Sequence, residues 1–167
     1  MADMQPHWDQ IICGIDTIVW SKLARWDLQQ TNLVAETDEK SFEAYCSSVN
    51  SRSGRWLCWI AFCVGAESLL KGAVGLKGYK MGNLGACHPW KKWFSMTPEE
   101  VGTVATGVCE LAQVRNRDAH YYVRGQRKLN FPSVKTDFVP ALNLVISHVD
   151  KGHLAAHYLS NSESSHT

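Results

Sequence analysis

The sequence lacks a strong charge of either sign. Its 167 residues include 17 Lys and Arg against 16 Asp and Glu, which gives a formal net charge of +1 at pH 7. A chain so nearly neutral has no overall electric field that would recruit nucleic acid or an anionic membrane. Any such binding must therefore depend on a local cluster of charged side chains.

Paired cysteines, an export signal and a long apolar run are also missing. None of the six cysteines belongs to a CxxC pair, and several lie among apolar residues, which favours reduced thiols and a cytoplasmic location. The opening sequence "MADMQPHWDQ" has no basic region followed by an apolar run, and no stretch of eighteen consecutive apolar residues occurs. We therefore expect a soluble, unexported protein with no membrane partner.

What the chain does contain is a series of apolar residues at helical spacing. Long amphipathic or apolar helices are expected at 8–30, 55–76, 97–122 and 138–154, with a short helix at 41–49 capped by Ser41. We find no convincing strand-like alternation and no internal repeat. The expected fold class is all-α, a bundle of four to five helices forming a single domain over 1–160, with a disordered tail at 161–167.

Two segments between these helices carry local signals. The sequence Thr97-Pro98-Glu99-Glu100 has a capping threonine, a proline at the first helical position and a glutamate that completes a capping box, so it predicts a helix start. The preceding loop at 77–96 is long enough to be either mobile or functional. Its basic and aromatic residues fit a second contact with nucleic acid, and they fit a packed loop as well: Lys77, Lys80, Trp90, Lys91, Lys92 and Trp93.

The third long helix delivers an arginine where a core residue is expected. Its apolar stripe of Val101, Val104, Val108 and Leu111 continues onto Arg115. A buried-facing arginine is costly unless it meets a carboxylate or lies at an interface or ligand site.

The second long helix offers that carboxylate. Its stripe of Ile60 and Val64, which we interpret as core-facing, continues onto Glu67 and Lys71. Two neighbouring core faces therefore each bring charged residues to one place. One interpretation is a partly buried Arg115–Glu67 pair that aligns two helices; the other is a functional site.

The sequence "RNRDAH" then carries a family resemblance. It resembles the signature of the HEPN superfamily (higher eukaryotes and prokaryotes nucleotide-binding), in which an arginine and a polar follower precede a histidine by four to six residues. Arg115, Asn116 and His120 occupy those positions, and "GAESLLKGAV", with Glu67 and Lys71, resembles the second helix of the family.

The resemblance implies a helical bundle that dimerises and a metal-independent endoribonuclease of a toxin, abortive-infection or phage-defence system. Arg115, His120 and Asn116 would be catalytic, with Glu67 and Lys71 supporting them, and no metal or cofactor is implied. Cleavage would leave a 2′,3′-cyclic phosphate and a 5′-hydroxyl. Tyr122 adds a similarity to HepT-type toxins, in which a nucleotidyltransferase antitoxin attaches AMP to such a tyrosine.

The residues around this motif are basic and aromatic, which is typical of contacts with single-stranded RNA, including parts of tRNA or mRNA. A solvated basic turn is the alternative. The candidate RNA-binding residues are Arg117, Tyr121, Tyr122, Arg124, Arg127 and Lys128.

Two other functional interpretations remain open from the sequence. The chain could be a catalytically inactive HEPN module that binds nucleotides or a protein, or a purely structural helical protein in which Arg115 pairs with Glu67. His153 and His157 lie one helical turn apart, but no cysteine or carboxylate stands at an obvious third position for a metal, so exposed histidines are the favoured interpretation.

Overall fold

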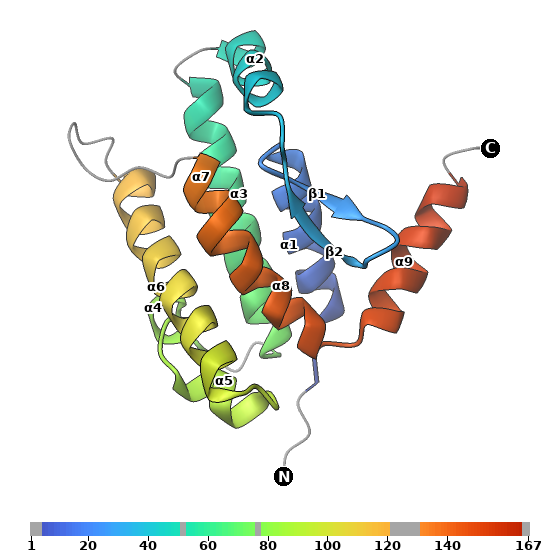
Figure 1. Ribbon diagram of the computed structural model, residues 1–167, viewed down its shortest axis with the longest axis vertical. Helices are drawn as coiled ribbons and strands as arrows, with labels where there is room; N and C mark the ends of the chain where they lie inside the picture. The colour runs from blue at the N-terminus through green and yellow to red at the C-terminus, as the bar shows by residue number, and fades with distance from the viewer. Residues whose placement is uncertain (1–4, 51–52, 76–77, 121–130, 165–167) are drawn as a thin grey trace.

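The computed structural model describes residues 5–50, 53–75, 78–120 and 131–164, with the side chains of 46–50, 53–55, 117–120 and 164 left aside. These residues form a mostly helical protein with one small antiparallel sheet (Figure 1). In chain order the elements are α1 (Trp8–Trp20), β1 (Ala24–Asp27), β2 (Asn32–Ala35), α2 (Glu39–Asn50), α3 (Ser53–Ala73), α4 (Met81–Leu84), α5 (His88–Trp93), α6 (Pro98–His120), α7 (Phe131–Ser133), the π-helical turn η1 (Val134–Phe138), α8 (Val139–His148) and α9 (Lys151–Ser164).

Helix α3 is the centre of the bundle, as its apolar sequence predicts. It packs against α1, α2, α6 and α8 (Figure 1). Its inward side chains include Phe62, which is fully buried and lies 6.5 Å from the Phe138 ring of η1, centroid to centroid. The core therefore joins segments from both halves of the chain around one helix.

The most extensive contact, between α1 and α3, depends on facing glycines. A Cβ atom placed on Gly14 would lie 2.6 Å from the carbonyl oxygen of Gly65 and 2.5 Å from the backbone nitrogen of Leu69. Only the absence of a side chain allows the two backbones to approach so closely. The hydroxyl of Ser68 donates a hydrogen bond to the Gln10 carbonyl in the same interface, at 2.9 Å.

The segment 21–35 departs from the predicted fold, because it forms a β-hairpin and the first helix does not continue to Gln30. Helix α1 ends at Trp20, and Lys22 has a left-handed φ of 65° that no α-helix accommodates. The carboxylate of Asp27 accepts hydrogen bonds from the backbone N–H groups of Gln29 and Gln30, which closes the turn between the strands.

An amide side chain of α8 binds the outer edge of the hairpin, beside the apolar packing of the strands on the helices. Leu33 is almost completely buried, and its backbone N–H and C=O point away from β1 toward Asn143 of α8. The Asn143 side chain accepts from the first at 2.8 Å and donates to the second at 2.7 Å. This amide pairs with the outer edge of β2 as a third strand would. Because β1 and β2 form a hairpin, the prediction of a fold without strands is wrong for this segment.

The observed helices also differ from the predicted ones at three other boundaries. Helix α2 begins at Glu39, and Asp38, rather than Ser41, accepts the capping hydrogen bond from the Ser41 N–H. The helix expected at 138–154 is divided in two, because Val149 adopts an extended conformation between α8 and α9. Helix α9 continues to Ser164, so residues 161–164 are helical rather than part of a disordered tail.

Helix α9 leans away from the bundle (Figure 1). Two contacts fix its position against α1: the His153 ring stacks on Trp8 at a centroid distance of 4.0 Å, and the Tyr158 hydroxyl donates to Asp16 at 2.9 Å. Burial and the Asp16 carboxylate raise the pKa of Tyr158 well above its ordinary value, so its hydroxyl remains protonated as the donor.

Among the described residues, one helix is long and apolar enough to span a membrane by length and composition, within α3 at Trp56–Ala73. Of that window 56% is buried inside the protein. The core helix of a soluble protein has the same length and composition, and the position of α3 in this bundle is consistent with that role.

Candidate functional site

The candidate site lies where the apolar stripe of α6 ends. Val101, Val104, Val108 and Leu111 are all at least 98% buried, as their spacing predicts. One turn further, the Arg115 side chain is 31% exposed and its Nη2 lies 3.2 Å from Oε2 of Glu67 on α3. The predicted meeting of the two charged residues at the α3–α6 interface is therefore confirmed.

Glu67 contacts two cations at once. Its Oε1 is 2.8 Å from Nζ of Lys71, one turn along α3, while its Oε2 contacts Arg115. The Glu67 side chain is 15% exposed, against 33% for Lys71. One carboxylate between two cations leaves the cluster with net positive charge on a surface that an anion can reach.

Asn116 extends this arrangement to a second side of the guanidinium. Nη1 of Arg115 donates to Oδ1 of Asn116 at 3.1 Å. The guanidinium is thus oriented by a carboxylate from α3 and an amide from its own helix. Because a guanidinium carries five N–H groups in a fixed plane, this orientation leaves donors for a bound anion.

The α3 surface beside the cluster is more exposed than the sequence predicted. Val64 is 47% exposed and Ile60 is half-buried, so the prediction that both face the core is wrong. Leu57, one further turn back, is 41% exposed and shares their side of the helix. The core of this helix uses a different face, which includes Phe62 and Leu69.

This apolar surface, formed by Leu57, Ile60 and Val64, leads directly to Glu67 and Lys71 along the helix. Sequence reasoning missed it because α3 is apolar almost all round, and such a sequence does not show which apolar residues are exposed.

The remaining residues of the predicted site lie largely outside the described part of the chain. His120 is the last residue of α6, and its side chain is among those left aside, as is that of Arg117. Since α6 is continuous from Arg115 to His120, five helical residues separate them by about 140° around the axis and about 7.5 Å along it. Tyr121, Tyr122, Arg124, Arg127 and Lys128 fall within 121–130, which the structure does not describe.

Within 78–96 the predicted loop contains the short helices α4 and α5, which are anchored by a few buried side chains such as Met81 and Leu84. Trp90 is fully buried and its indole N–H donates to the Leu84 carbonyl at 2.6 Å, so Trp90 is not a nucleic-acid contact. Lys80, Lys91 and Lys92 are exposed, and Lys77 lies outside the described residues.

The paired histidines of α9 line a groove against α1. Its volume is about 810 Å³ and its lining includes Trp8, Trp20, His153 and His157. His157 contacts Asn161 at 3.1 Å, and His153 stacks on Trp8. Among the residues that the structure describes, no group of three or more His, Cys, Asp or Glu is placed to hold a metal ion.

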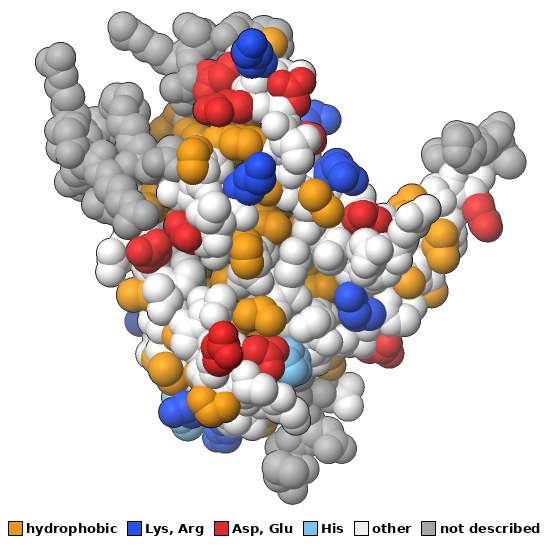
Figure 2. Space-filling view, in the orientation of Figure 1, with side chains coloured by type: hydrophobic (Ala, Val, Ile, Leu, Met, Phe, Trp, Pro, Cys, Tyr) orange, Lys and Arg blue, Asp and Glu red, His pale blue; other side chains and the backbone are white. Residues whose placement is uncertain are grey.

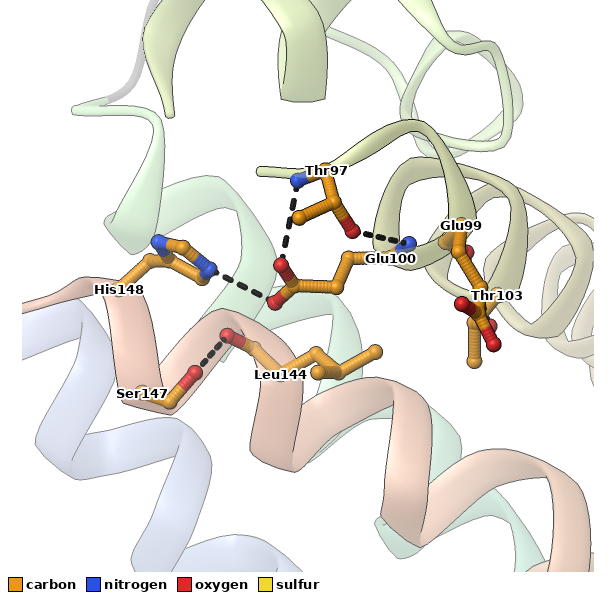
Figure 3. Close-up of polar contacts among 7 residues, drawn as sticks. All are labelled: Thr97, Glu99, Glu100, Thr103, Leu144, Ser147 and His148. Carbon is orange, nitrogen blue, oxygen red and sulfur yellow. Dashed lines mark hydrogen bonds and ion pairs between the residues drawn. The ribbon is translucent and has the colours of Figure 1, made fainter. Parts of the chain in front are cut away.

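A separate polar cluster is found at the other end of α6 (Figure 3). The Thr97 N–H donates to Glu100 Oε1 at 3.1 Å and the Glu100 N–H donates to Thr97 Oγ1 at 3.2 Å, which confirms the predicted capping box. The other carboxylate oxygen of Glu100 lies 3.0 Å from Nε2 of His148 on α8. These contacts, the one with His148 first, lower the pKa of Glu100.

Comparison of the chain with known protein families, curated proteins and solved structures finds no match. The case for a function therefore depends on the sequence motif and on the described geometry.

Proposed function

We propose that this chain is a metal-independent endoribonuclease of a toxin or antiviral-defence system, acting as a cytoplasmic homodimer of HEPN type. The observation that carries the proposal is the partly exposed Arg115 guanidinium, oriented by Glu67 and Asn116 at the end of α6. An arginine held in this way presents its free donors to a phosphate without first having to be ordered.

His120 supplies the proton transfers in this proposal. Histidine changes its charge near neutral pH, so one imidazole can accept the proton of the ribose 2′-hydroxyl while a second donates a proton to the 5′-oxygen. The 2′-oxygen forms a bond to phosphorus as the bond to the 5′-oxygen breaks. Arg115 stabilises the charge that develops on the phosphate, and the products are a 2′,3′-cyclic phosphate and a 5′-hydroxyl.

Two His120 side chains at one site require two copies of the chain. The exposed apolar surface of Leu57, Ile60 and Val64 lies on the same helix as Glu67 and Lys71, which favours it as the contact between subunits. A two-fold axis through this surface would bring two Arg115 side chains toward a shared site.

The segment after Arg115 is the basis for the proposed class of RNA and the proposed class of regulator. Arg117, Tyr121, Tyr122, Arg124, Arg127 and Lys128 combine positive charge with aromatic rings, which suits single-stranded RNA or the unpaired parts of tRNA and mRNA. A nucleotidyltransferase antitoxin that modifies Tyr122 would place AMP beside the site and block it.

Replacing His120 tests the proposal directly. In cells, induction of the wild-type chain should arrest growth and fragment RNA, while His120→Ala should do neither. With purified protein and excess chelator, the substitution should reduce cleavage by about 10²- to 10⁴-fold, because it removes the proton-transfer group.

His157→Ala is the matched control, since it removes the same side chain from α9, a helix that supplies none of the proposed catalytic residues. The proposal fails if cleavage depends on magnesium, if the products carry a 3′-hydroxyl, or if His120→Ala and His157→Ala both cut like the wild type.

A second candidate is a purely structural helical protein, in which Arg115 pairs with Glu67. The Arg115–Glu67 ion pair favours it, because the same contact would align α3 with α6. In that case Glu67→Gln should lower the melting temperature, and His120→Ala should change neither growth nor RNA. A nuclease requires the opposite result for His120.

A further inference from the structure

The α4–α5 segment carries an exposed cluster of basic side chains, formed by Lys80, His88, Lys91 and Lys92. In Figure 2, blue and pale-blue side chains gather at the lower left, the end of the molecule where Figure 1 draws α5. The formal charge of the whole chain is only +1, so this cluster is a strong local departure from an almost neutral protein.

The backbone beneath the basic cluster is fixed. Trp90 is fully buried, its indole N–H donates to Leu84, and its ring lies 5.4 Å from that of Phe94, centroid to centroid. Since Lys91 and Lys92 follow Trp90 on the same short helix, the anchoring of Trp90 holds both lysines at the surface. The backbone that carries the two lysines is therefore ordered before any ligand arrives, so only the side chains remain to be ordered on binding.

Aromatic rings accompany these charges. The indole N–H of Trp93 donates to the Tyr79 hydroxyl at 3.0 Å, and Nζ of Lys92 lies 4.7 Å from the Trp93 ring centroid. Both residues are half-buried. Within the described part of the chain, no ion pair joins Lys80, Lys91 or Lys92 to a carboxylate.

We propose that the basic cluster of Lys80, His88, Lys91 and Lys92 binds the phosphodiester backbone of RNA, at a distance from the Arg115 site. Lysines that pair with no described carboxylate, beside half-buried aromatic residues, fit a polyanion with stacking bases better than they fit a smooth anionic surface. The inference deepens the proposed function, and in its relation to Arg115 it rests on that proposal.

The geometry also defines a minimum length of substrate. Helix α6 begins beside α5 and carries Arg115 near its other end (Figure 1). Seventeen residues separate Pro98 from Arg115, and a rise of about 1.5 Å per residue places the two ends about 26 Å apart. An RNA must extend over that distance to touch both surfaces, so long or folded RNAs gain a contact that short oligonucleotides cannot make.

The experiment measures binding, so that it does not depend on cleavage. A fluorescein-labelled, 2′-O-methylated RNA of 30 nucleotides, which has no 2′-hydroxyl to react, is titrated with the wild-type chain and with Lys91→Ala/Lys92→Ala. Fluorescence anisotropy at several salt concentrations gives the affinity and its salt dependence. We expect the double variant to bind about tenfold more weakly, with a salt slope smaller by about 1.4, as the loss of two phosphate contacts requires for a single strand.

The matched control is Arg25→Ala/Lys40→Ala, which removes two exposed positive charges from β1 and α2. This variant should bind the 30-nucleotide RNA like the wild type. A 6-nucleotide RNA is too short to touch both surfaces, so the wild type should bind it more weakly than it binds the 30-nucleotide RNA.

Failure of this inference is distinct from failure of the proposed nuclease. If both double variants bind like the wild type, or if the wild type does not bind the RNA, the basic cluster is not an RNA surface. If the Lys91/Lys92 substitutions weaken binding only to phosphatidylserine vesicles, the cluster is a lipid surface and the inference is overturned. If binding depends on Lys91 and Lys92 but the protein cuts no RNA, the result supports this inference and contradicts the proposed nuclease activity.

Discussion

Three contacts meet at Glu100: its carboxylate accepts from the Thr97 N–H, its backbone N–H donates to Thr97 Oγ1, and its carboxylate also contacts His148 of α8. The sequence predicted the first two, because a capping box is local and its spacing is fixed. It did not predict His148, since a pair separated by 48 positions depends on how α6 and α8 pack. The same limit applies to the site, where the stripe of α6 predicted Arg115 and the stripe of α3 predicted Glu67, but neither predicted the Asn116 contact with the guanidinium.

The lowered pKa of Glu100 predicts a particular dependence of stability on pH. A carboxylate whose pKa in the folded state lies below its ordinary value of 4.5 stabilises the fold above that value and loses this contribution as the pH falls through the folded pKa. Glu100→Gln should therefore be less stable than the wild type at pH 7, and the difference should shrink as the pH decreases below about 4.5.

Urea denaturation of the two proteins between pH 7 and pH 3 measures this difference. Glu99→Gln is the control, because the Glu99 side chain is exposed and takes no part in the capping box. A difference between wild type and Glu100→Gln that stays constant over this range would show that the ionised carboxylate does not stabilise the fold.

At the scale of elements, the helices of the core follow from the periodicity of the sequence, whereas the hairpin does not. Leu23 and Trp26 continue the helical spacing of α1, so the segment looks helical until the Asp27 turn and the partner strand are considered together. The exposed side of α3 was missed for a related reason. Val64 and Phe62 are both apolar, and only the neighbouring helices determine which of them is covered.

The hairpin gives a prediction about Asn143. Removing its amide leaves the backbone N–H and C=O of the buried Leu33 without their partner. Asn143→Ala should reduce the free energy of unfolding by roughly 1–3 kcal/mol, the usual cost of an unsatisfied buried polar group. The urea midpoint measures this loss.

Ser147→Ala, on the exposed part of the same helix, should change the stability by less than about 0.5 kcal/mol. Equal midpoints for the Asn143 and Ser147 variants would mean that water replaces the amide and that the hairpin is not fixed through α8.

For the molecule as a whole, the proposed function requires two copies that meet through Leu57, Ile60 and Val64. Because Val64 is 47% exposed in the single chain, Val64→Asp should leave the fold nearly as stable as before. A charge at the centre of an apolar contact should, however, convert dimers to monomers and abolish RNA cleavage. Light scattering after size-exclusion chromatography measures the mass, and thermal melting verifies the fold.

Leu159→Asp, at another exposed apolar residue, is the matched control on α9 and should remain dimeric. A wild-type protein that is monomeric at all concentrations, or a Val64→Asp variant that stays dimeric, contradicts this assignment of the subunit contact.

The facing glycines of α1 and α3 also bear on how fast the protein folds. Gly14 and Gly65 are 51 positions apart, and closing a loop of that length costs about 3.5 kcal/mol of chain entropy by the logarithmic rule, before any constant term. Helical proteins fold quickly when their contacts are local. Here the most extensive helix pair is a long-range contact, and its two backbones must align closely before it forms. We therefore expect this chain to fold more slowly than its helical content alone would suggest. During folding, its central helix should stay uncovered for longer than in a bundle whose contacts join helices that are adjacent in sequence.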